Sequence, residues 1–177
     1  MKKTVVLLFS IISFYTGIVE AHGPTRQKVI VKEQISVSPQ AVWDVVKDFH
    51  DMSWHPAVIK TEGDGGNSSG AKRILMLPND GKIYEILEKY DSEKHSFFYR
   101  IEKVDVKVLP VTNYSSWFNI APAEDGGSVV TWKGAFYRGF PNNEPPPELS
   151  DQAAVDAVTG VYKSGLSNLK KLLEQGS

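Results

Sequence analysis

Three polar residues and a set of aromatic residues are the candidates for chemistry in this chain. His55 stands in the segment Trp54-His55-Pro56, which follows a predicted helix. A histidine titrates near neutral pH and can serve as a general acid or base. The sequence shows no evident partner for such a proton transfer, so packing of His55 against Trp54 is the stronger expectation. We therefore predict no catalytic residue, although catalysis by His55 stays open as an alternative.

Arg73 and Glu85 form the second candidate group. Glu85 lies between Ile83 and Leu87, on a strand face that the alternation of apolar residues places inside. A buried carboxylate is costly unless a partner compensates its charge. A three-residue connection within residues 78–81 would put Arg73 and Glu85 on one face as diagonal neighbours, whereas two or four residues would separate them. The ion pair is therefore a hypothesis, with a purely structural salt bridge or two solvated charges as alternatives.

Aromatic side chains recur on the face of three predicted strands that alternation turns inward. Buried tyrosine and tryptophan need partners for their polar atoms, either from a ligand or from hydrogen bonds within the core. Both interpretations remain open. The candidate residues for a ligand cavity are Trp54, His55, Arg73, Glu85, Tyr99, Tyr114, Phe118, Trp132 and Phe136.

Composition excludes several classes of site. The chain has no cysteine, which excludes disulfides, thiolate metal sites, iron–sulfur clusters and covalent c-type haem. It has no phosphate loop, dinucleotide fingerprint or zinc-protease motif. The formal net charge of −1 argues against broad nucleic-acid binding. We therefore expect no metal, no cofactor and no nucleic-acid partner.

The first 21 residues have the layout of a secretory signal peptide. Lys2 and Lys3 precede a mostly apolar run over residues 4–18, and Val19-Glu20-Ala21 offers small residues for cleavage after Ala21. The apolar run is shorter than the ~20 residues of a spanning helix, so an uncleaved anchor is the weaker alternative. The lysine-led signal looks bacterial. We expect a periplasmic protein with one domain, residues 22–177, and no membrane span after cleavage.

Alternation and turn residues predict an α+β fold. The predicted strands are residues 27–36, 71–77, 82–90, 95–103, 112–121 and 127–138, and residues 63–70 form a predicted loop or hairpin tip. A first helix begins at Ser38-Pro39 and stops near His50. Prolines interrupt residues 139–147, and a long last helix runs from a cap at Ser150 to about residue 174. We expect a curved antiparallel sheet of six or seven strands wrapped around that helix.

Two glycines interrupt the last helix. Gly160 and Gly165 each cost roughly 1 kcal/mol relative to alanine within a helix. They are either tolerated or mark places where the helix lies close to the sheet or to a ligand. The sequence leaves both interpretations open.

An ordered set of short motifs resembles a known family. Trp54-His55-Pro56-Ala57-Val58 is followed by Gly70-Ala71-Lys72-Arg73, Ile83-Tyr84-Glu85-Ile86-Leu87, Tyr99-Arg100-Ile101 and Val130-Thr131-Trp132-Lys133-Gly134-Ala135-Phe136. In this order they resemble the polyketide cyclase/dehydrase-like branch of the START-related helix-grip superfamily, over nearly all of residues 27–175. The resemblance implies a helix-grip fold with a cavity between the sheet and the last helix.

Signal peptide and size make the chain similar to the MxaD-like periplasmic proteins of bacterial methanol oxidation. That resemblance implies an accessory role, supporting methanol dehydrogenase and its interaction with its cytochrome c acceptor. A carrier of a small hydrophobic ligand and a cyclase- or dehydratase-like enzyme are the alternatives, because a fold alone does not settle function. Partner contacts would use the loop around Trp54, expected to be exposed, or the proline-rich residues 139–149.

Overall fold

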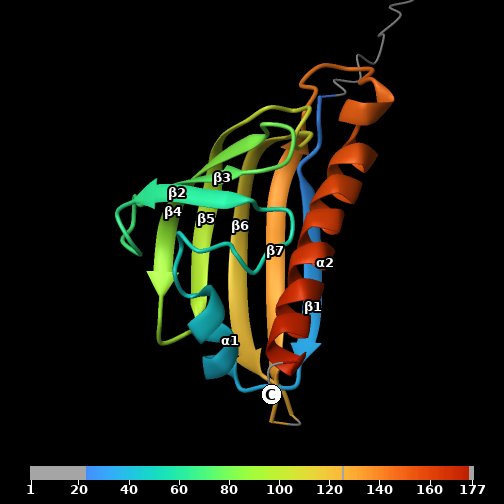
Figure 1. Cartoon of the computed structure of the whole chain (residues 1–177). Helices are drawn as coiled ribbons and strands as arrows, with labels where there is room; N and C mark the ends of the chain where they lie inside the picture. Colours follow the sequence, from blue (N-terminus) through green and yellow to red (C-terminus); the bar gives the residue numbers. More distant parts are fainter. Residues whose placement is uncertain (1–22, 125, 176–177) are drawn as a thin grey trace, which may run out of the picture.

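The strands of this protein form one antiparallel sheet (Figure 1). The computed structural model describes residues 23–124 and 126–175. The strands are β1 (Gln27–Ile35), β2 (Lys60–Asp64), β3 (Lys72–Met76), β4 (Lys82–Asp91), β5 (Ser96–Val104), β6 (Val111–Pro122) and β7 (Ser128–Arg138). Their order across the sheet is β1-β7-β6-β5-β4-β3-β2, so β1 and β2 are the two edges. The predicted α+β class, with six or seven antiparallel strands and a long last helix, is confirmed, and the number of strands is seven.

β2 is the strand that the sequence did not predict. Its five residues are mostly charged or glycine and lack apolar alternation, and four of them are exposed. It pairs on one side only, with β3, at the edge of the sheet. The prediction of a loop over residues 63–70 was therefore wrong at its start, because Gly63 and Asp64 belong to this strand.

The first helix begins at the predicted cap and ends earlier than predicted. α1 spans Pro39–Val46, and Ser38 Oγ accepts a hydrogen bond from the Ala41 N–H. Phe49 lies beyond the helix and is still fully buried. The chain then passes through successive turns, in which the N–H groups of Asp51, His55 and Val58 donate to carbonyls three residues earlier. These turns place Trp54 and His55 in the space between the sheet and the last helix, where both are buried.

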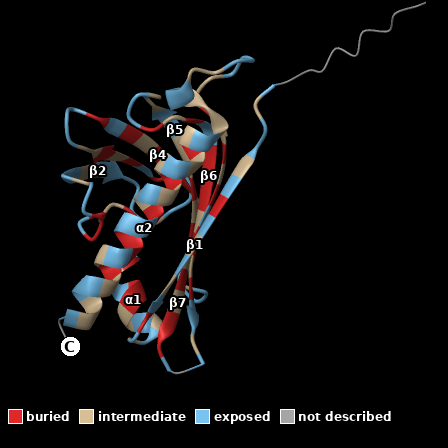
Figure 2. Ribbon diagram, turned by 90° about the vertical axis from the view of Figure 1, so that its right-hand side faces the viewer, coloured by how far each residue is buried: buried red, intermediate tan, exposed pale blue. Residues whose placement is uncertain are grey.

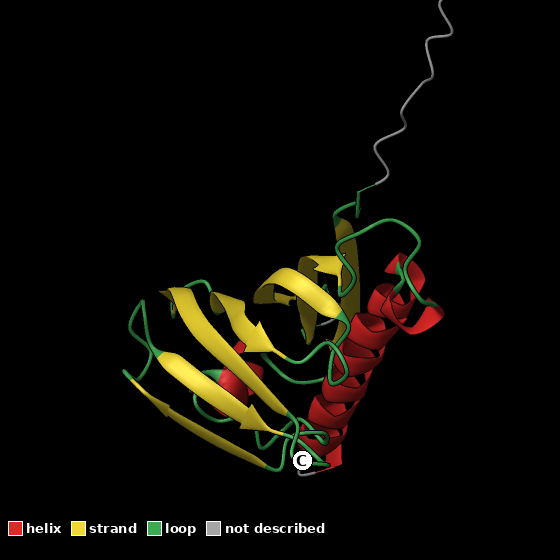
Figure 3. Ribbon diagram, turned by 90° about the horizontal axis from the view of Figure 1, so that it is seen from above, coloured by secondary structure: helices red, strands yellow, loops and turns green. Residues whose placement is uncertain are grey.

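The last helix lies along the β1 and β7 side of the sheet. α2 spans Asp151–Gln175 and contacts both strands. Figure 2 shows buried and exposed residues alternating along α2, and its buried residues include Val158, Tyr162 and Leu166. Figure 3 shows the strands curving while α2 lies across one side of the curved sheet. The sheet and the helix thus enclose the core between them, as a helix-grip fold requires.

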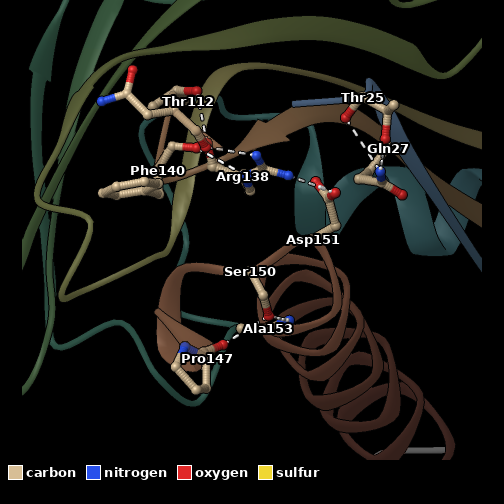
Figure 4. A network of polar contacts seen from close by, with 10 residues as sticks. Thr25, Gln27, Thr112, Arg138, Phe140, Pro147, Ser150, Asp151 and Ala153 are labelled. Atoms are coloured by element: carbon tan, nitrogen blue, oxygen red, sulfur yellow. Dashed lines mark hydrogen bonds and ion pairs between the residues drawn. The ribbon is translucent and has the colours of Figure 1, made fainter. Parts of the chain in front are cut away.

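The proline-rich segment before α2 is fastened by one arginine. It contains a single turn of 3-10 helix, η1 (Pro147–Leu149). The Arg138 guanidinium donates to the carbonyls of Phe140 and Asn142 and forms an ion pair with Asp151 at 2.9 Å (Figure 4). Ser150 Oγ accepts from the Ala153 N–H as the predicted cap of α2. The end of β7, this segment and the start of α2 therefore form one connected polar network.

The predicted signal peptide, residues 1–21, lies outside the described residues. Among the residues that the structure describes, no helix is both long and apolar enough to cross a bilayer.

Candidate functional site

A small cavity is lined by residues of β3, β4 and β5 on one side and by Val161 of α2 on the other. Its volume is about 80 Å³. Six of the predicted cavity residues line it: His55, Arg73, Glu85, Tyr99, Tyr114 and Trp132. The remaining lining residues are Met52, Ala57, Val58, Leu75, Leu77, Ile83, Ile101, Leu109 and Val161. The wall is therefore mostly apolar, with a few polar groups that converge from different elements, which is the usual composition of a small-molecule site.

Arg73 and Glu85 form a buried ion pair on the wall of this cavity. Arg73 Nε lies 2.6 Å from Glu85 Oε2, and the two residues are 2% and 4% exposed. Arg73 Nη1 also donates to the Phe49 carbonyl at 2.6 Å, and its guanidinium stacks over the Phe49 ring, 4.1 Å from the ring centre. The cation is thereby held by a carboxylate, a carbonyl and an aromatic face.

The pairing geometry corrects one detail of the sequence analysis. Arg73 and Glu85 stand directly opposite one another in the β3–β4 register, not as diagonal neighbours. The Leu77 N–H donates to the Gly81 carbonyl, so the connection has three residues, residues 78–80. Asn79 and Asp80 take the left-handed backbone conformation there, with φ of 57° and 59°. The polar Asn and Asp side chains tolerate this region better than most, which explains their place in the turn.

Burial dominates the titration of Glu85. Loss of water raises the pKa of the Glu85 carboxyl, and the charge and hydrogen bond of Arg73 oppose that rise. Breaking such a pair would leave the remaining partner buried without compensation, which is strongly unfavourable. Glu85 is thus tied to Arg73 and is not a free carboxylate facing the cavity.

A chain of hydroxyl groups forms the second polar feature of the site. Trp132 Nε1 donates to Tyr99 Oη at 3.0 Å, Tyr99 and Tyr114 hydroxyls lie 3.4 Å apart, and Tyr114 contacts the Tyr162 hydroxyl. Tyr162 and Ser116 hydroxyls are 2.9 Å apart, and Ser116 Oγ donates to the Lys133 carbonyl. Each hydroxyl can donate to the next and accept from the one before, so the chain ends satisfied at a backbone carbonyl.

Burial makes these phenols poor acids. It raises the pKa of Tyr99 to about 12, with a further contribution from the negative charge of Glu85. Burial likewise raises the pKa of Tyr114 and Tyr162 well above 10. The three hydroxyls therefore stay protonated at neutral pH, and those of Tyr99 and Tyr114, which line the cavity, can orient a ligand by hydrogen bonding.

We expect Tyr162→Phe to lower the free energy of unfolding by about 1–3 kcal/mol, because the buried hydroxyls of Tyr114 and Ser116 each lose one of their hydrogen-bond partners. Urea unfolding at pH 7 measures the change. Tyr84→Phe is the matched control, because Tyr84 is only partly buried and forms no hydrogen bond through its side chain within the described part of the chain. Equal stability of the two variants would contradict a structural role for the hydroxyl chain.

His55 is buried between the sheet and α2, with both ring nitrogens engaged. The Ala57 N–H donates to Nδ1 at 3.2 Å, so Nδ1 is the acceptor and Nε2 carries the hydrogen that reaches the Val161 carbonyl at 3.0 Å. The ring meets Trp54 edge-on, with 5.8 Å between centres, in agreement with the predicted packing. Burial lowers the pKa of His55 below its ordinary value of 6.5, and the positive charge of Arg73 adds to this effect.

The lowered pKa predicts a loss of stability in acid. Unfolded His55 binds a proton below about pH 6.5 while the folded ring resists protonation. Its contribution to stability is therefore complete above pH 6.5 and is lost as the pH falls toward the folded pKa. We expect the free energy of unfolding of the wild type to fall more between pH 7 and pH 5 than that of His55→Gln, measured by urea unfolding at each pH. Parallel profiles would show that His55 titrates alike in both states.

The absence of a side chain at Gly165 allows the His55 ring to lie against α2. A Cβ at Gly165 would meet His55 Cδ2 at 2.5 Å and Trp132 at 3.0 Å. A Cβ at Gly160 would meet nothing within 4 Å. The close approach of the helix to its neighbours therefore requires a glycine at position 165, whereas the glycine at position 160 is only tolerated. Gly134 on β7 similarly leaves space for the Tyr162 hydroxyl.

Trp54, Phe118 and Phe136 do not line the cavity. They are 2%, 0% and 0% exposed and belong to the hydrophobic core. The expectation that Trp54 is an exposed contact residue was wrong, because its ring packs against those of Phe118 and Trp132. The Asn168 side chain, which donates to the Trp54 carbonyl, fastens the loop to α2.

Sequence reasoning missed two residues of the hydroxyl chain. Ser116 lies two residues from both Tyr114 and Phe118 on β6, so strand alternation alone places it on the inward face. Tyr162 lies in the predicted last helix, and only the packing of α2 on β7 reveals the role of its hydroxyl. Among residues 23–124 and 126–175, no group of three histidine, aspartate or glutamate residues is placed to hold a metal ion.

Comparison with known proteins supports the fold and the family. Residues 26–174 match the model of the family described as polyketide cyclase / dehydrase and lipid transport. XoxI from Bacillus cereus is similar with 27% identity and a TM-score of 0.70, over 83% of this chain and 95% of that protein. A protein from Nitrosospira multiformis has 23% identity and a TM-score of 0.70, over 85% and 100%.

A plant enzyme shares the same fold at lower identity. Norcoclaurine synthase from Thalictrum flavum has 16% identity and a TM-score of 0.64, over 98% of this chain and 99% of the enzyme. No curated protein matches the chain. The family match covers most of the sequence and the described structure has the corresponding architecture. The chain therefore belongs to the polyketide cyclase/dehydrase and lipid transport family.

Proposed function

We propose that this protein binds a small ligand without transforming it, and serves as a periplasmic accessory protein of methanol oxidation. The observation that supports binding is the apolar cavity bordered by the Arg73–Glu85 pair and the hydroxyls of Tyr99 and Tyr114. The phenolic oxygens keep lone pairs that can accept from a ligand. The periplasmic location and the process rest on the resemblance of the sequence to MxaD-like proteins.

The state of the polar groups favours binding over catalysis. Both nitrogens of His55 are occupied, Glu85 is paired with Arg73, and the phenols have raised pKa values. A general base needs a free lone pair within reach of the proton that it removes. A cyclase- or dehydratase-like activity is the alternative, and activity abolished by replacing His55, Arg73 or Glu85 while the fold is retained would favour it.

The volume of the cavity limits the ligand. Drug-sized ligands occupy pockets of about 300–1,000 Å³, and an engineered cavity of about 150 Å³ holds benzene. The present volume of about 80 Å³ accepts only a very small molecule or one end of a larger one.

A cavity-filling variant tests whether the cavity serves the proposed process. Val58→Phe fills the cavity from its loop wall, whereas Val129→Phe adds the same bulk to a partly buried position of β7 that does not line it. In a methanol-oxidising host that lacks the gene, we expect slower methanol-dependent oxygen uptake, with unchanged dehydrogenase activity toward an artificial acceptor. Wild type and Val129→Phe should restore uptake and Val58→Phe should not. Unchanged uptake after deletion would contradict the accessory role.

A further inference from the structure

A wide surface groove lies directly outside the cavity. It has a volume of about 730 Å³ and is bordered by the β3–β4 turn, the start of β4, the end of β5 and the loop after β5. Three residues line both the groove and the cavity: Ala57, Leu77 and Val161. They come from the loop after α1, the position directly after β3, and α2. Only these side chains are shared by the two hollows, and we call them the septum.

The groove carries a cluster of lysines that form no ion pair with residues 23–124 or 126–175. Lys82, Lys103 and Lys107 line it and are exposed. In the part of the chain that the structure describes, none of the three forms a salt bridge, whereas nearby Lys60 and Lys72 are paired with Glu62 and Glu102. The lysines are thus available to an anion from outside.

The acidic residues of the groove do not neutralise this cluster. Asp80 and Asp105 are the two carboxylates in the lining, against three lysines. Asp105 Oδ1 accepts a hydrogen bond from the backbone N–H of Lys107 at 2.9 Å, and the Lys107 ammonium takes no part in it. Lys103 lies opposite Tyr84 in the β4–β5 register, with its Nζ 5.5 Å from the centre of that ring. The groove therefore has a positive balance next to apolar surface supplied by Leu77, Val104 and Val108.

We propose that the cavity and the groove form one bipartite site for an amphipathic anion, such as a carboxylic acid with a short alkyl chain. The apolar end passes the septum and enters the cavity, and the anionic end stays in the groove beside Lys82, Lys103 and Lys107. This division fits the sizes of the two hollows, since the cavity has about 80 Å³ and the groove about 730 Å³. The inference rests on the proposed ligand-binding function and adds the charge and polarity of the ligand.

Calorimetric titration with octanoate tests the proposal, with 1-octanol as the neutral probe of equal chain length. We expect octanoate to bind more tightly than 1-octanol and its affinity to fall as salt increases. The triple variant Lys82→Gln/Lys103→Gln/Lys107→Gln should bind octanoate about tenfold more weakly and 1-octanol unchanged, since each exposed charge pair contributes modestly. Lys28→Gln/Lys32→Gln/Lys171→Gln is the matched control with the same change in net charge.

A second variant tests the septum. Ala57→Trp places a large side chain where the groove meets the cavity, and Ala121→Trp places it at an exposed position of β6. We expect Ala57→Trp to abolish binding of both probes and Ala121→Trp to leave it unchanged.

The outcomes separate the two proposals. Equal affinity for octanoate and 1-octanol, or equal weakening by the two lysine triples, would overturn anion recognition and leave ligand binding intact. Unchanged binding in Ala57→Trp would overturn the connection between the hollows. Failure of both probes to bind would count against the proposed ligand-binding function itself, and the inference would fall with it.

Discussion

Replacing Glu85 with glutamine is expected to lower the free energy of unfolding by about 3–5 kcal/mol, because it leaves the Arg73 guanidinium buried without its carboxylate. Most of this loss is the cost of burying the unpaired Arg73 charge, and little of it is the net contribution of the ion pair to stability. The double variant Arg73→Met/Glu85→Leu, which removes both charges, should therefore recover most of the lost stability. Urea unfolding followed by circular dichroism at pH 7 measures all three proteins.

An exposed ion pair of the same length provides the control. Lys60 Nζ and Glu62 Oε1 also lie 2.6 Å apart, but their side chains are 62% and 46% exposed. Glu62→Gln should have almost no effect, because water screens this pair. If Glu85→Gln were as mild as Glu62→Gln, Arg73 and Glu85 would not be a buried charge pair at neutral pH, and the polar wall of the cavity would need a different explanation.

Two glycines of the same helix should respond in opposite directions to the same substitution. Gly165→Ala should lower the free energy of unfolding by about 1–3 kcal/mol, since the new Cβ must displace His55 and Trp132. Gly160→Ala should raise it by about 0.5–1 kcal/mol, because the position is open and alanine favours a helix. Thermal and urea unfolding of the two variants check the signs.

The same two variants also test whether His55 forms part of the ligand cavity. His55 lines it, so its displacement in Gly165→Ala should also weaken binding of 1-octanol, whereas Gly160→Ala should bind like the wild type. A stabilising effect of Gly165→Ala would mean that His55 and α2 are not in contact through this glycine.

Strand alternation predicted the inward face of the sheet correctly. Tyr99, Tyr114, Phe118, Trp132 and Phe136 are all buried, because each alternates with more exposed neighbours on a strand whose other face meets solvent. Alternation failed for β2, where Lys60–Asp64 offers no apolar residue and the pairing with β3 decides the structure.

The candidate site depended on features that a sequence does not fix. The Arg73–Glu85 pairing requires the register of β3 and β4, and that register depends on which residues of the turn adopt the left-handed conformation. Trp54 was expected to be exposed because an exposed tryptophan suits contacts with a partner protein. Its burial requires the close approach of α2. The Asn168 side chain of this helix donates a hydrogen bond to the Trp54 carbonyl, and the Val161 carbonyl accepts one from His55 Nε2.

Native mass spectrometry of the protein, isolated gently from the cells that produce it, tests the central claim most directly. We predict a discrete small added mass on the wild type and on Val129→Phe, and its loss from Val58→Phe, whose side chain fills the cavity. Collisional release of that mass would then identify the ligand and its charge. A wild-type protein that is always empty, or an added mass equally abundant on Val58→Phe, would contradict ligand binding in this cavity.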